Sequence, residues 1–560
     1  MTRFIFVTGG VVSSLGKGIA TASIGRLLRS RGLNVRLQKL DPYINVDADT
    51  MNPFQHGEAF VTDDGAVTDL DLGHYERFTN IALTRHSSVT TGSVYRDVIA
   101  AERRGDYDGA TVQTIPHVTN AIKDRIRLVA KTGKNERKVD VVVAEVGGTV
   151  GDIEGLPFLE AIRQMRADVG LRNVMYIHVT LVPGVGPWDE QKTKPTQHSV
   201  IKLREIGIHP DMLICRSKRQ MSDDMLRKIS LFCDVPVCAV IPSVDTSTVY
   251  DVPLKLEVAG VAEQIVKRFG LRCDPPDLDA WQRIVRRITS NTRRVHVAVV
   301  GKYVDNSDAY ISIREALHHA AAAADCNVMI TWVNSRGLRS SDIAKAVNGA
   351  NAMVVAPGFG VDGIEGKLHA VQHARVTGLP FLGICLGMQM AVVEFARNVA
   401  GIPDAESGEV DPATPNPVVH IMPEQRLRGN RGGTMRLGSR ECQLAANSLA
   451  SRLYGVETIR ERHRHRYEVN NDYRARLIGA GMDCSGTSPD GKFVEIVEIP
   501  GHPFFIGCQF HPEFQSRPDL PHPLFVGLVK AALDRAEREA AGDAGRTHTA
   551  AAPADGVSNV

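Results

Sequence analysis

Short apolar runs alternate with longer segments of helical periodicity through most of the chain. In the first half these runs are rich in valine and isoleucine and are bounded by glycine, proline or aspartate, which is typical of buried strands. The predicted strands of this half are Phe4–Val7, Val35–Gln38, Val141–Glu145, Val174–His178, Met212–Cys215 and Val237–Ile241. Helical patterns lie between them, among them Ile19–Ser30 and Leu156–Val169. Because strands and helices alternate, we predict an α/β fold with a parallel sheet covered by helices on both faces.

The pattern changes between residues 271 and 293, where CDPPD can continue neither a strand nor a helix and polar sequence follows. A second α/β pattern starts at Val295. Its predicted strands include Val328–Val333, Ala352–Ala356, Pro380–Cys385 and Phe504–Phe510. The small, polar residues at the end predict a disordered tail. We therefore expect a first domain at 1–270, a linker at 271–293, a second domain at 294–539 and a tail at 540–560.

Composition narrows the class of protein. The chain has 560 residues, 43% hydrophobic and 23% charged, with a net charge of +2. These are ordinary values for a soluble globular protein, and near-neutrality gives no reason to expect a nucleic acid or a membrane as partner. The nine cysteines include no CxxC pair, which favours a reducing compartment over a disulfide framework. Neither a signal peptide nor a membrane-spanning run is evident, so we expect a cytoplasmic protein.

A glycine-rich loop follows the first predicted strand. The segment GGVVSSLGKGIATAS joins this strand to a helix, so backbone N–H groups and the helix N-terminus can bind an anion there. Lys17 adds a positive charge for phosphate oxygens. The spacing departs from a strict Walker A motif, because Gly18 replaces the usual serine or threonine. Together these features predict a phosphate-binding loop.

Two carboxylates and one basic segment are further candidates in this half. Asp71 lies in TDLDLGHYERF, which we interpret as an acidic loop, and Glu145 closes an apolar strand. Ligands of open α/β sheets bind at the carboxyl ends of strands, and magnesium needs only one or two carboxylates beside phosphates. The segment KTKPTQ, at 192–197, combines cations and hydroxyl groups suited to a triphosphate.

The glycine-rich loop, TDLDLGHYERF and KTKPTQ occur together with KLDPYINVD, MNPFQHGE, VQTIPHVTNAIK and EVGGTVGDIE. With these motifs, the chain from Phe4 to about Pro242 resembles the synthetase domain of the CTP synthase family. The resemblance implies a P-loop NTPase-like fold of the dethiobiotin synthetase type, with Lys17 and Lys39 assisting phosphoryl transfer. It implies ATP binding by Ser14, Leu15, Gly16, Lys17, Gly18, Ile19, Asp71, Val244 and Asp245. It implies Mg²⁺ binding by Asp71 and Glu145. It implies UTP or CTP binding by Ser13, Asp152, Ile153, Glu154, Lys192, Thr193, Lys194, Pro195, Thr196, Gln197 and Lys228.

The second half carries a candidate nucleophile. Cys385 follows an apolar strand and opens a helix, with Gly383 and Gly387 on either side, which is the cysteine form of a nucleophile elbow. The helix N-terminus favours a thiolate. Near the end of the domain, His511 and Glu513 stand two residues apart, so in a strand both would point to one face. We predict that Glu513 orients His511, which accepts the thiol proton.

Residues from about Val295 to Leu533 resemble class I glutamine amidotransferases, with a flavodoxin-like sheet. The resemblance implies that glutamine and its oxyanion are held by Gly358, Leu386, Gly387, Met388, Gln389, Glu409 and Arg466. One departure is visible where that family usually has PGGFG followed by an aromatic residue and an arginine. Pro357 has no N–H, so an oxyanion donor expected there is missing, and the loss of one such donor can cost roughly 100-fold or more in rate. The resemblance therefore implies glutamine use, and especially GTP activation, less strongly than it implies ammonia-dependent synthesis. Asp362 replaces the cation expected near the GTP activator.

Both resemblances together imply ATP-dependent amination of UTP to CTP, with ammonia released from L-glutamine. The implied reaction passes through a 4-phosphorylated UTP intermediate and a glutamyl thioester on Cys385. The resemblance also implies activation by GTP and feedback inhibition by CTP. It implies a homotetramer, and filament assembly is a possible second role. The alternative is another P-loop amidoligase with a glutaminase domain, similar to a cobyrinic acid amidase, but it would lack KTKPTQ and TDLDLGHYERF. A partition-type P-loop ATPase would leave Cys385, His511 and Glu513 unexplained.

Overall fold

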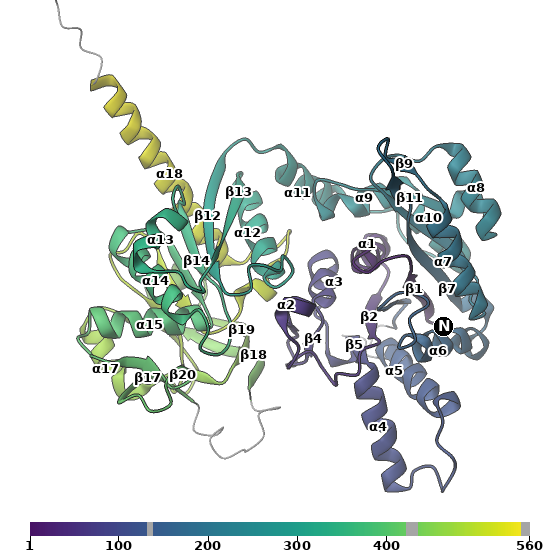
Figure 1. Ribbon diagram of the computed structural model, residues 1–560, viewed down its shortest axis with the longest axis horizontal. Helices are drawn as coiled ribbons and strands as arrows, with labels where there is room; N and C mark the ends of the chain where they lie inside the picture. Colours follow the sequence, from purple (N-terminus) through teal and green to yellow (C-terminus); the bar gives the residue numbers. More distant parts are fainter. Residues whose placement is uncertain (132–137, 422–434, 550–560) are drawn as a thin grey trace, which may run out of the picture. The chain divides into compact units, whose positions relative to one another are not determined.

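The computed structural model describes residues 1–131, 138–421 and 435–549 (Figure 1). The chain forms two compact units, one of residues 1–289 with 517–519 and one of residues 290–516 with 520–560. Each unit is built on its own sheet, and both are α/β, which confirms the predicted fold class.

The first unit contains a seven-stranded parallel sheet in the order β11-β10-β7-β1-β6-β2-β5. Its strands are β1 (Arg3–Gly9), β2 (Val35–Asp41), β5 (Ser88–Thr90), β6 (Val141–Val146), β7 (Val174–Leu181), β10 (Met212–Ser217) and β11 (Val240–Val244). All six predicted strands are present, but the last one starts later than predicted. Val237–Ala239 forms a 3₁₀ turn after Pro236, closed by the Ala239 N–H donating to the Pro236 carbonyl at 2.8 Å.

Helices cover both faces of this sheet. The main ones are α1 (Lys17–Arg29), α3 (Asp71–Thr79), α4 (Thr91–Arg104), α5 (Thr119–Lys131), α6 (Leu156–Val169), α7 (Lys194–Glu205), α8 (Asp223–Cys233), α9 (Val252–Val258), α10 (Val261–Phe269) and α11 (Asp279–Ser290). Short elements are α2 (Pro53–His56), β3 (Phe60–Val61), β4 (Val67–Thr68), β8 (Gly184–Val185) and β9 (Glu190–Gln191). One core joins alternate residues of β1 and β6 to α4, α5, α6 and α7, and α1 packs against α3 and α9.

The second unit contains a nine-stranded mixed sheet in the order β13-β12-β14-β15-β23-β22-β21-β18-β19. Its parallel strands are β12 (Arg294–Gly301), β13 (Asn327–Asn334), β14 (Ala352–Val355), β15 (Phe381–Ile384) and β23 (Phe505–Cys508). An antiparallel extension consists of β18 (Arg436–Leu444), β19 (Thr458–His465), β21 (Asp483–Thr487) and β22 (Val494–Glu498). A small sheet is formed by β16 (Ala405–Ser407), β17 (Asn416–Ile421) and β20 (Tyr467–Val469).

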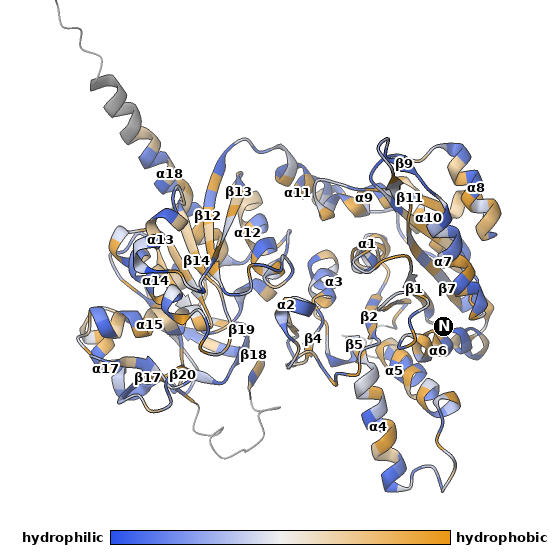
Figure 2. Ribbon diagram, viewed as in Figure 1, coloured by the Kyte–Doolittle hydropathy of each residue, from blue (hydrophilic) through white to orange (hydrophobic). Residues whose placement is uncertain are grey.

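Two hydrophobic cores lie on opposite faces of the nine-stranded sheet, and β12 and β14 are hydrophobic along most of their length (Figure 2). The helices are α12 (Ile311–Ala323), α13 (Ser340–Ala346), α14 (Ile364–Thr377), α15 (Leu386–Asn398), α16 (Leu449–Tyr454), α17 (Asn471–Gly479) and α18 (Pro523–Thr549). α12 and α18 contribute to one core, whereas α14 and α15 contribute to the other.

Helices are present in the segment that we expected to be a linker and in the one that we expected to be a disordered tail. α11 lies within the expected linker, and Trp281 on it is buried, with its Nε1–H donating to the Tyr250 carbonyl at 2.7 Å. α18 extends into the expected tail as far as Thr549, and residues 550–560 lie outside the described part. Of the helices in the described part, none combines the length and apolar character needed to cross a bilayer.

Candidate active sites

The glycine-rich loop connects β1 to α1 and bends sharply. Ser14 and Gly16 have positive φ angles of 55° and 96°, and such turns direct successive backbone N–H groups to one side, where they can hold an anion. Lys17 is the first residue of α1, and its Nζ donates to the Gly148 carbonyl at 2.7 Å. Burial lowers the pKa of Lys17. The cation is thus held beside the loop, as phosphate binding requires.

The departure from the Walker A pattern at position 18 has a structural cause. A Cβ atom on Gly18 would lie 2.0 Å from Oδ1 of Asp71, so a side chain fits there only if the Asp71 carboxylate or the loop moves. In a Walker A loop the serine or threonine at this position supplies a metal ligand. Here the Asp71 carboxylate, from another element, occupies that space with its oxygens.

Lys39 lies between the two predicted magnesium ligands. In the register of β2 and β6, Lys39 is the direct partner of Glu145, and its Nζ is 2.9 Å from Oε1 of that residue. The same Nζ contacts the Asp71 carboxylate, and Tyr75 donates to Glu145. Burial would lower the pKa of Lys39, but Asp71 and Glu145 outweigh it and hold this pKa well above its usual value. Burial raises the pKa of Glu145.

This donor set fits magnesium bound together with phosphates. Magnesium keeps several waters and commonly takes one or two carboxylates beside substrate phosphates. Asp71 and Glu145 supply two, from different elements but on one side of the phosphate loop. Within residues 1–131, 138–421 and 435–549, no group of three or more His, Cys, Asp or Glu side chains is placed to hold a metal. Asp71 is not in a loop, as we expected, but is the first residue of α3, where the helix dipole favours an acidic side chain.

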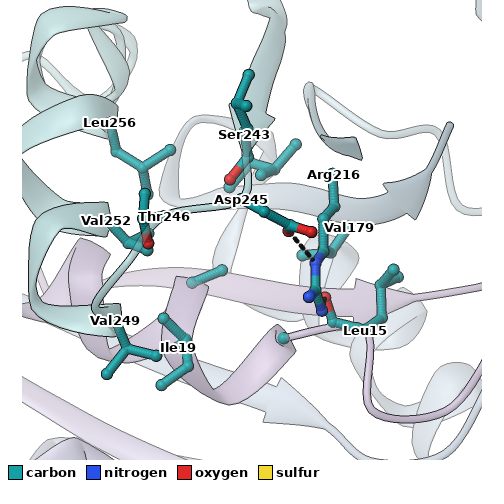
Figure 3. Close-up of a pocket in the computed structure, with 14 residues that line it drawn as sticks. Leu15, Ile19, Val179, Arg216, Ser243, Asp245, Thr246, Val249, Val252 and Leu256 are labelled. Carbon is teal, nitrogen blue, oxygen red and sulfur yellow. Dashed lines mark hydrogen bonds and ion pairs between the residues drawn. The ribbon is translucent and has the colours of Figure 1, made fainter. Parts of the chain in front are cut away.

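A cavity of about 280 Å³ lies beside the phosphate loop (Figure 3). Its walls present both apolar and polar groups and come from the loop, α1, the ends of β10 and β11, and α9; the apolar side chains include Leu15, Ile19, Val244, Val252 and Leu256. Arg216 and Asp245 form an ion pair of 2.8 Å at its edge. Arg216 also donates to the Ser14 and Leu15 carbonyls at 3.3 Å, so it joins the phosphate loop to the cavity. Five of the residues expected at ATP thus line one pocket.

The residues expected at the pyrimidine nucleotide are less closely gathered. Thr196 and Gln197 are buried in the first turns of α7, where the Thr196 hydroxyl donates to the Leu181 carbonyl at 3.0 Å. Asp152 accepts the Thr149 N–H at 2.8 Å. The rest line neither cavity described in this section: Thr193 is buried, Lys192 and Pro195 are partly exposed, and the exposed ones are Ser13, Ile153, Glu154, Lys194 and Lys228.

Cys385 lies at the sharp turn between β15 and α15. Its backbone has φ 52° and ψ −104°, a strained conformation that the neighbouring glycines permit. A Cβ on Gly387 would lie 2.1 Å from the Val355 carbonyl oxygen, and one on Gly383 would lie 2.8 Å from Gly387. Glycine at 387 therefore allows the turn to approach β14, and glycine at 383 allows the strand to approach the start of α15.

His511 and Glu513 form the predicted pair, but by a different geometry. β23 ends at Cys508, and the residues after His511 form a 3₁₀ turn at Pro512–Phe514, so the two side chains do not share a strand face. Pro512 has no N–H to continue the ladder. His511 Nδ1 lies 2.7 Å from Glu513 Oε1. Burial opposes protonation of His511, but Glu513 and Cys385 outweigh it and raise the pKa of His511 to about 10.

A small cavity opens at Cys385. It is lined by Gly358, Phe359, Cys385, Gln389, Glu409, His465, Arg466 and Tyr467. Of the predicted glutamine ligands, Gly358, Gln389, Glu409 and Arg466 are therefore at the nucleophile. Leu386, Gly387 and Met388 are buried in the first turn of α15 and do not line the cavity. Glu409 accepts the Gly360 N–H at 2.7 Å, and burial raises its pKa.

Two buried lysines beside this cavity were not predicted. Lys302 donates to the Phe359 carbonyl and Lys367 donates to the Ala356 carbonyl. His465 and Tyr467 were also missed, although Arg466 between them was assigned to glutamine, because a run of charge such as RHRHRY is usually solvent-exposed. The buried state of His463 and His465 shows instead an alternating strand end with one face inside. Nothing in the sequence around Lys367 predicts that this lysine of α14 is buried beside the cavity.

A strained cysteine elbow with a histidine and a glutamate, on a flavodoxin-like sheet, defines the second unit as a glutamine amidotransferase joined to a phosphate-loop unit. Residues 3–271 match the family described as CTP synthase N-terminus, and residues 306–531 match glutamine amidotransferase class-I. CTP synthase from Thermosynechococcus vestitus is 58% identical over 539 residues, which cover 96% of this chain and 98% of the relative. CTP synthase from a Synechococcus strain is 58% identical over 533 residues, covering 95% and 97%.

The chain belongs to the CTP synthase family. It is thereby a glutamine-hydrolysing ligase that forms a carbon–nitrogen bond. Among solved structures, the Trypanosoma brucei CTPS glutaminase domain with bound acivicin is 36% identical, with a TM-score of 0.41, and covers 43% of this chain and 94% of its own.

Proposed function

We propose that the enzyme aminates UTP in two steps in its first unit. The 4-oxygen of UTP attacks the γ-phosphorus of ATP and ADP leaves. The lone pair of ammonia then attacks carbon 4, and phosphate leaves with the former 4-oxygen. Lys17 and Lys39 stabilise the charge on the transferred phosphoryl group. Magnesium, held by Asp71 and Glu145, would neutralise phosphate charge.

The proposal assigns binding of ATP to the phosphate loop and the neighbouring cavity, with Val244 and Asp245 beside the base. One observation carries it: Lys39, Asp71 and Glu145 meet at the carboxyl ends of parallel strands, directly beside Gly18. A cation and two carboxylates at that place suit phosphoryl transfer, which needs positioning and charge neutralisation rather than a nucleophilic side chain.

We propose that the second unit supplies the ammonia. The Cys385 thiolate attacks the side-chain amide carbon of glutamine, the C–N bond breaks, and His511 gives its proton to the departing ammonia. Water then hydrolyses the glutamyl thioester to glutamate. Gly358 and residues 386–389 would hold the amide and its oxyanion, and Glu409 and Arg466 the amino acid end. The 2.7 Å contact of His511 with Glu513 supports this assignment.

Assembly and regulation are parts of the same proposal. We propose a homotetramer that can form filaments, with each UTP site completed by another subunit. The exposure of Ile153, Glu154 and Lys228 supports this, because these side chains need partners to form a binding site. We propose activation by GTP and feedback inhibition by CTP. Asp362 pairs with Arg336 at 2.5 Å, so a guanidinium still lies where the usual arginine is replaced.

The proposal extends to location and domain limits. It places the synthetase domain at 1–270 and the amidotransferase domain at 294–539, joined by 271–293. It places the enzyme in the cytoplasm, which the nine free cysteines support, since reducing compartments keep thiols free.

Oxygen labelling tests the central chemistry. UTP carrying ¹⁸O at position 4 is incubated with the enzyme, ATP, magnesium and ammonium chloride. The proposal predicts that the label appears in inorganic phosphate, because the oxygen leaves on the transferred phosphoryl group. Label in water instead would mean direct displacement of hydroxide and would refute the phosphorylated intermediate. A control with ¹⁸O in the ribose hydroxyls should release no label.

A further inference from the structure

Lys367 is a buried cation that the chemistry described above does not use. It lies in the first turns of α14, and its side chain is 0% exposed. Its Nζ donates to the Ala356 carbonyl and, at 3.4 Å, to the Pro357 carbonyl. Within the described part of the chain, no carboxylate lies at ion-pair distance from it. Burial, followed by the charge of Lys302, lowers the pKa of Lys367 to about 7. Keeping such a group inside a core is costly, so its contacts need an explanation.

The two carbonyls belong to the loop that faces the nucleophile. Pro357 and Gly358 share one peptide group, and Gly358 lines the cavity with Cys385. In a trans peptide the C=O and N–H bonds point in opposite directions. The Pro357 oxygen accepts from Lys367 and, at 3.3 Å, from the Tyr310 hydroxyl. These two donors therefore fix the plane of this peptide and turn the Gly358 N–H away from themselves.

The Gly358 N–H is available as a hydrogen-bond donor. Among residues 1–131, 138–421 and 435–549, no acceptor takes it, whereas the next loop donor but one, the Gly360 N–H, is bound by Glu409. Pro357 has no N–H at all, so this loop has one donor fewer to offer an oxyanion. Hydrogen bonds donated to the carbonyl side also polarise the peptide and strengthen the N–H on the other side as a donor.

We propose that Lys367 is a positioning residue that orients the Pro357–Gly358 peptide so that the Gly358 N–H faces the oxyanion formed when Cys385 attacks glutamine. The inference rests on the proposed glutamine hydrolysis. Because an oxyanion exists only in the transition state and intermediate, loss of Lys367 should lower kcat and leave glutamine binding largely intact.

The test compares Lys367→Met with Lys345→Met, a matched substitution at an exposed position of α13. For Lys367→Met we expect glutamine-dependent kcat to fall by about 100-fold, with KM for glutamine changed by less than about 3-fold. Ammonia-dependent CTP formation should equal that of the wild type. Alkylation of Cys385 by iodoacetamide, followed by peptide mass spectrometry, should keep its rate, because it passes through no oxyanion. Lys345→Met should match the wild type throughout.

Three results would overturn the inference: an unchanged glutamine kcat in Lys367→Met, a loss confined to KM, or a parallel loss of Cys385 alkylation, which would indicate a general structural role. If Lys367→Met does not accumulate as folded protein, Tyr310→Phe removes the other donor to Pro357 and should lower the same kcat by about 10-fold. A wild-type enzyme that uses ammonia but not glutamine would instead refute the proposed glutaminase, and this inference with it.

Discussion

The carboxylate of Asp71 occupies the space that a side chain at position 18 would need: a Cβ on Gly18 would lie 2.0 Å from Asp71 Oδ1. The phosphate loop therefore has a glycine at position 18, without a hydroxyl, where the carboxylate at the start of α3 needs the space. Where a Walker A loop carries a hydroxyl oxygen, a carboxylate oxygen from a neighbouring helix lies here instead.

Restoring the Walker A residue should accordingly damage the enzyme. Gly18→Ser forces either Asp71 or the loop to move, a change that costs about 1–3 kcal/mol in a packed site. We expect CTP formation to fall by roughly 10- to 100-fold with glutamine and with ammonia alike. Steady-state assays with both nitrogen donors measure this. A variant with wild-type rates would show that Asp71 does not need this space.

Arg216 should matter for ATP and not for glutamine. Its guanidinium holds the Ser14 and Leu15 carbonyls and pairs with Asp245 at the edge of the cavity. The ion pair is partly exposed and contributes little by itself, so the carbonyl contacts dominate. Arg216→Met should raise KM for ATP by about 10-fold. Arg227→Met, on the exposed face of α8, serves as the control and should leave KM unchanged.

Much of the fold could be predicted where local pattern and burial agree. Leu156–Val169 forms a helix with the predicted limits, and β6 differs from its prediction by one residue. The antiparallel extension was missed, because β19 reads TIRERHRH and looks like an exposed charged run, although Arg462 and His463 are buried. Its polar residues meet buried partners on other strands of the sheet, such as Glu495 of β22, which pairs with Arg436 of β18 at 2.6 Å, and only the assembled sheet reveals this.

The sequence identified candidate site residues by their types and motifs, but it predicted less well which elements position them. Cys385 was placed at a strand-to-helix turn, and it is there. Asp71 and His511 were assigned to a loop and a strand, whereas a helix start and a 3₁₀ turn position them. Lys39 could be joined to Glu145 only through the β2–β6 register, which depends on strand order and so on contacts far apart in the sequence.

Gly387 should be indispensable for the nucleophile elbow. A Cβ there would lie 2.1 Å from the Val355 carbonyl oxygen, which belongs to backbone and cannot easily move. Gly387→Ala should therefore displace Cys385 and lower glutamine-dependent CTP formation by 10-fold or more, roughly the effect of 1–3 kcal/mol of strain. Ammonia-dependent formation should persist.

The matched control is Gly479→Ala at the end of α17, where a Cβ would meet nothing within 4 Å. That variant should be as active as the wild type and at least as stable, because alanine favours a helix over glycine by about 0.5–1 kcal/mol. A Gly387→Ala enzyme as active as Gly479→Ala would contradict the geometry of the elbow.

The pair of His511 and Glu513 should make stability depend on pH in the alkaline range. The folded-state pKa of His511 is raised to about 10, above its ordinary value of 6.5. The stabilisation is therefore complete below about pH 6.5 and is lost as pH rises towards 10. In thermal unfolding from pH 6 to 10, Glu513→Gln should unfold at a lower temperature than the wild type at pH 6.5, and the two should converge near pH 10.

The exposed Glu457→Gln variant is the control, with a small difference from the wild type at all pH values. If the difference in unfolding temperature between Glu513→Gln and the wild type grew with pH, it would contradict a stabilising interaction between Glu513 and protonated His511. Glu513→Gln should also lose about 10²–10⁴-fold in glutamine-dependent kcat, because His511 is no longer oriented and held protonated as the acid that protonates the departing ammonia.

The most direct measurement is CTP formation from UTP, ATP and magnesium, followed by ultraviolet absorbance, with glutamine or ammonium chloride as nitrogen donor. The wild type should form CTP from both donors. Cys385→Ser should keep the ammonia reaction and lose at least about 10³-fold with glutamine, because the nucleophile is gone. Formation of CTP from glutamine by Cys385→Ser, or no CTP from ammonia by the folded wild type, would contradict the account of two sites in one chain.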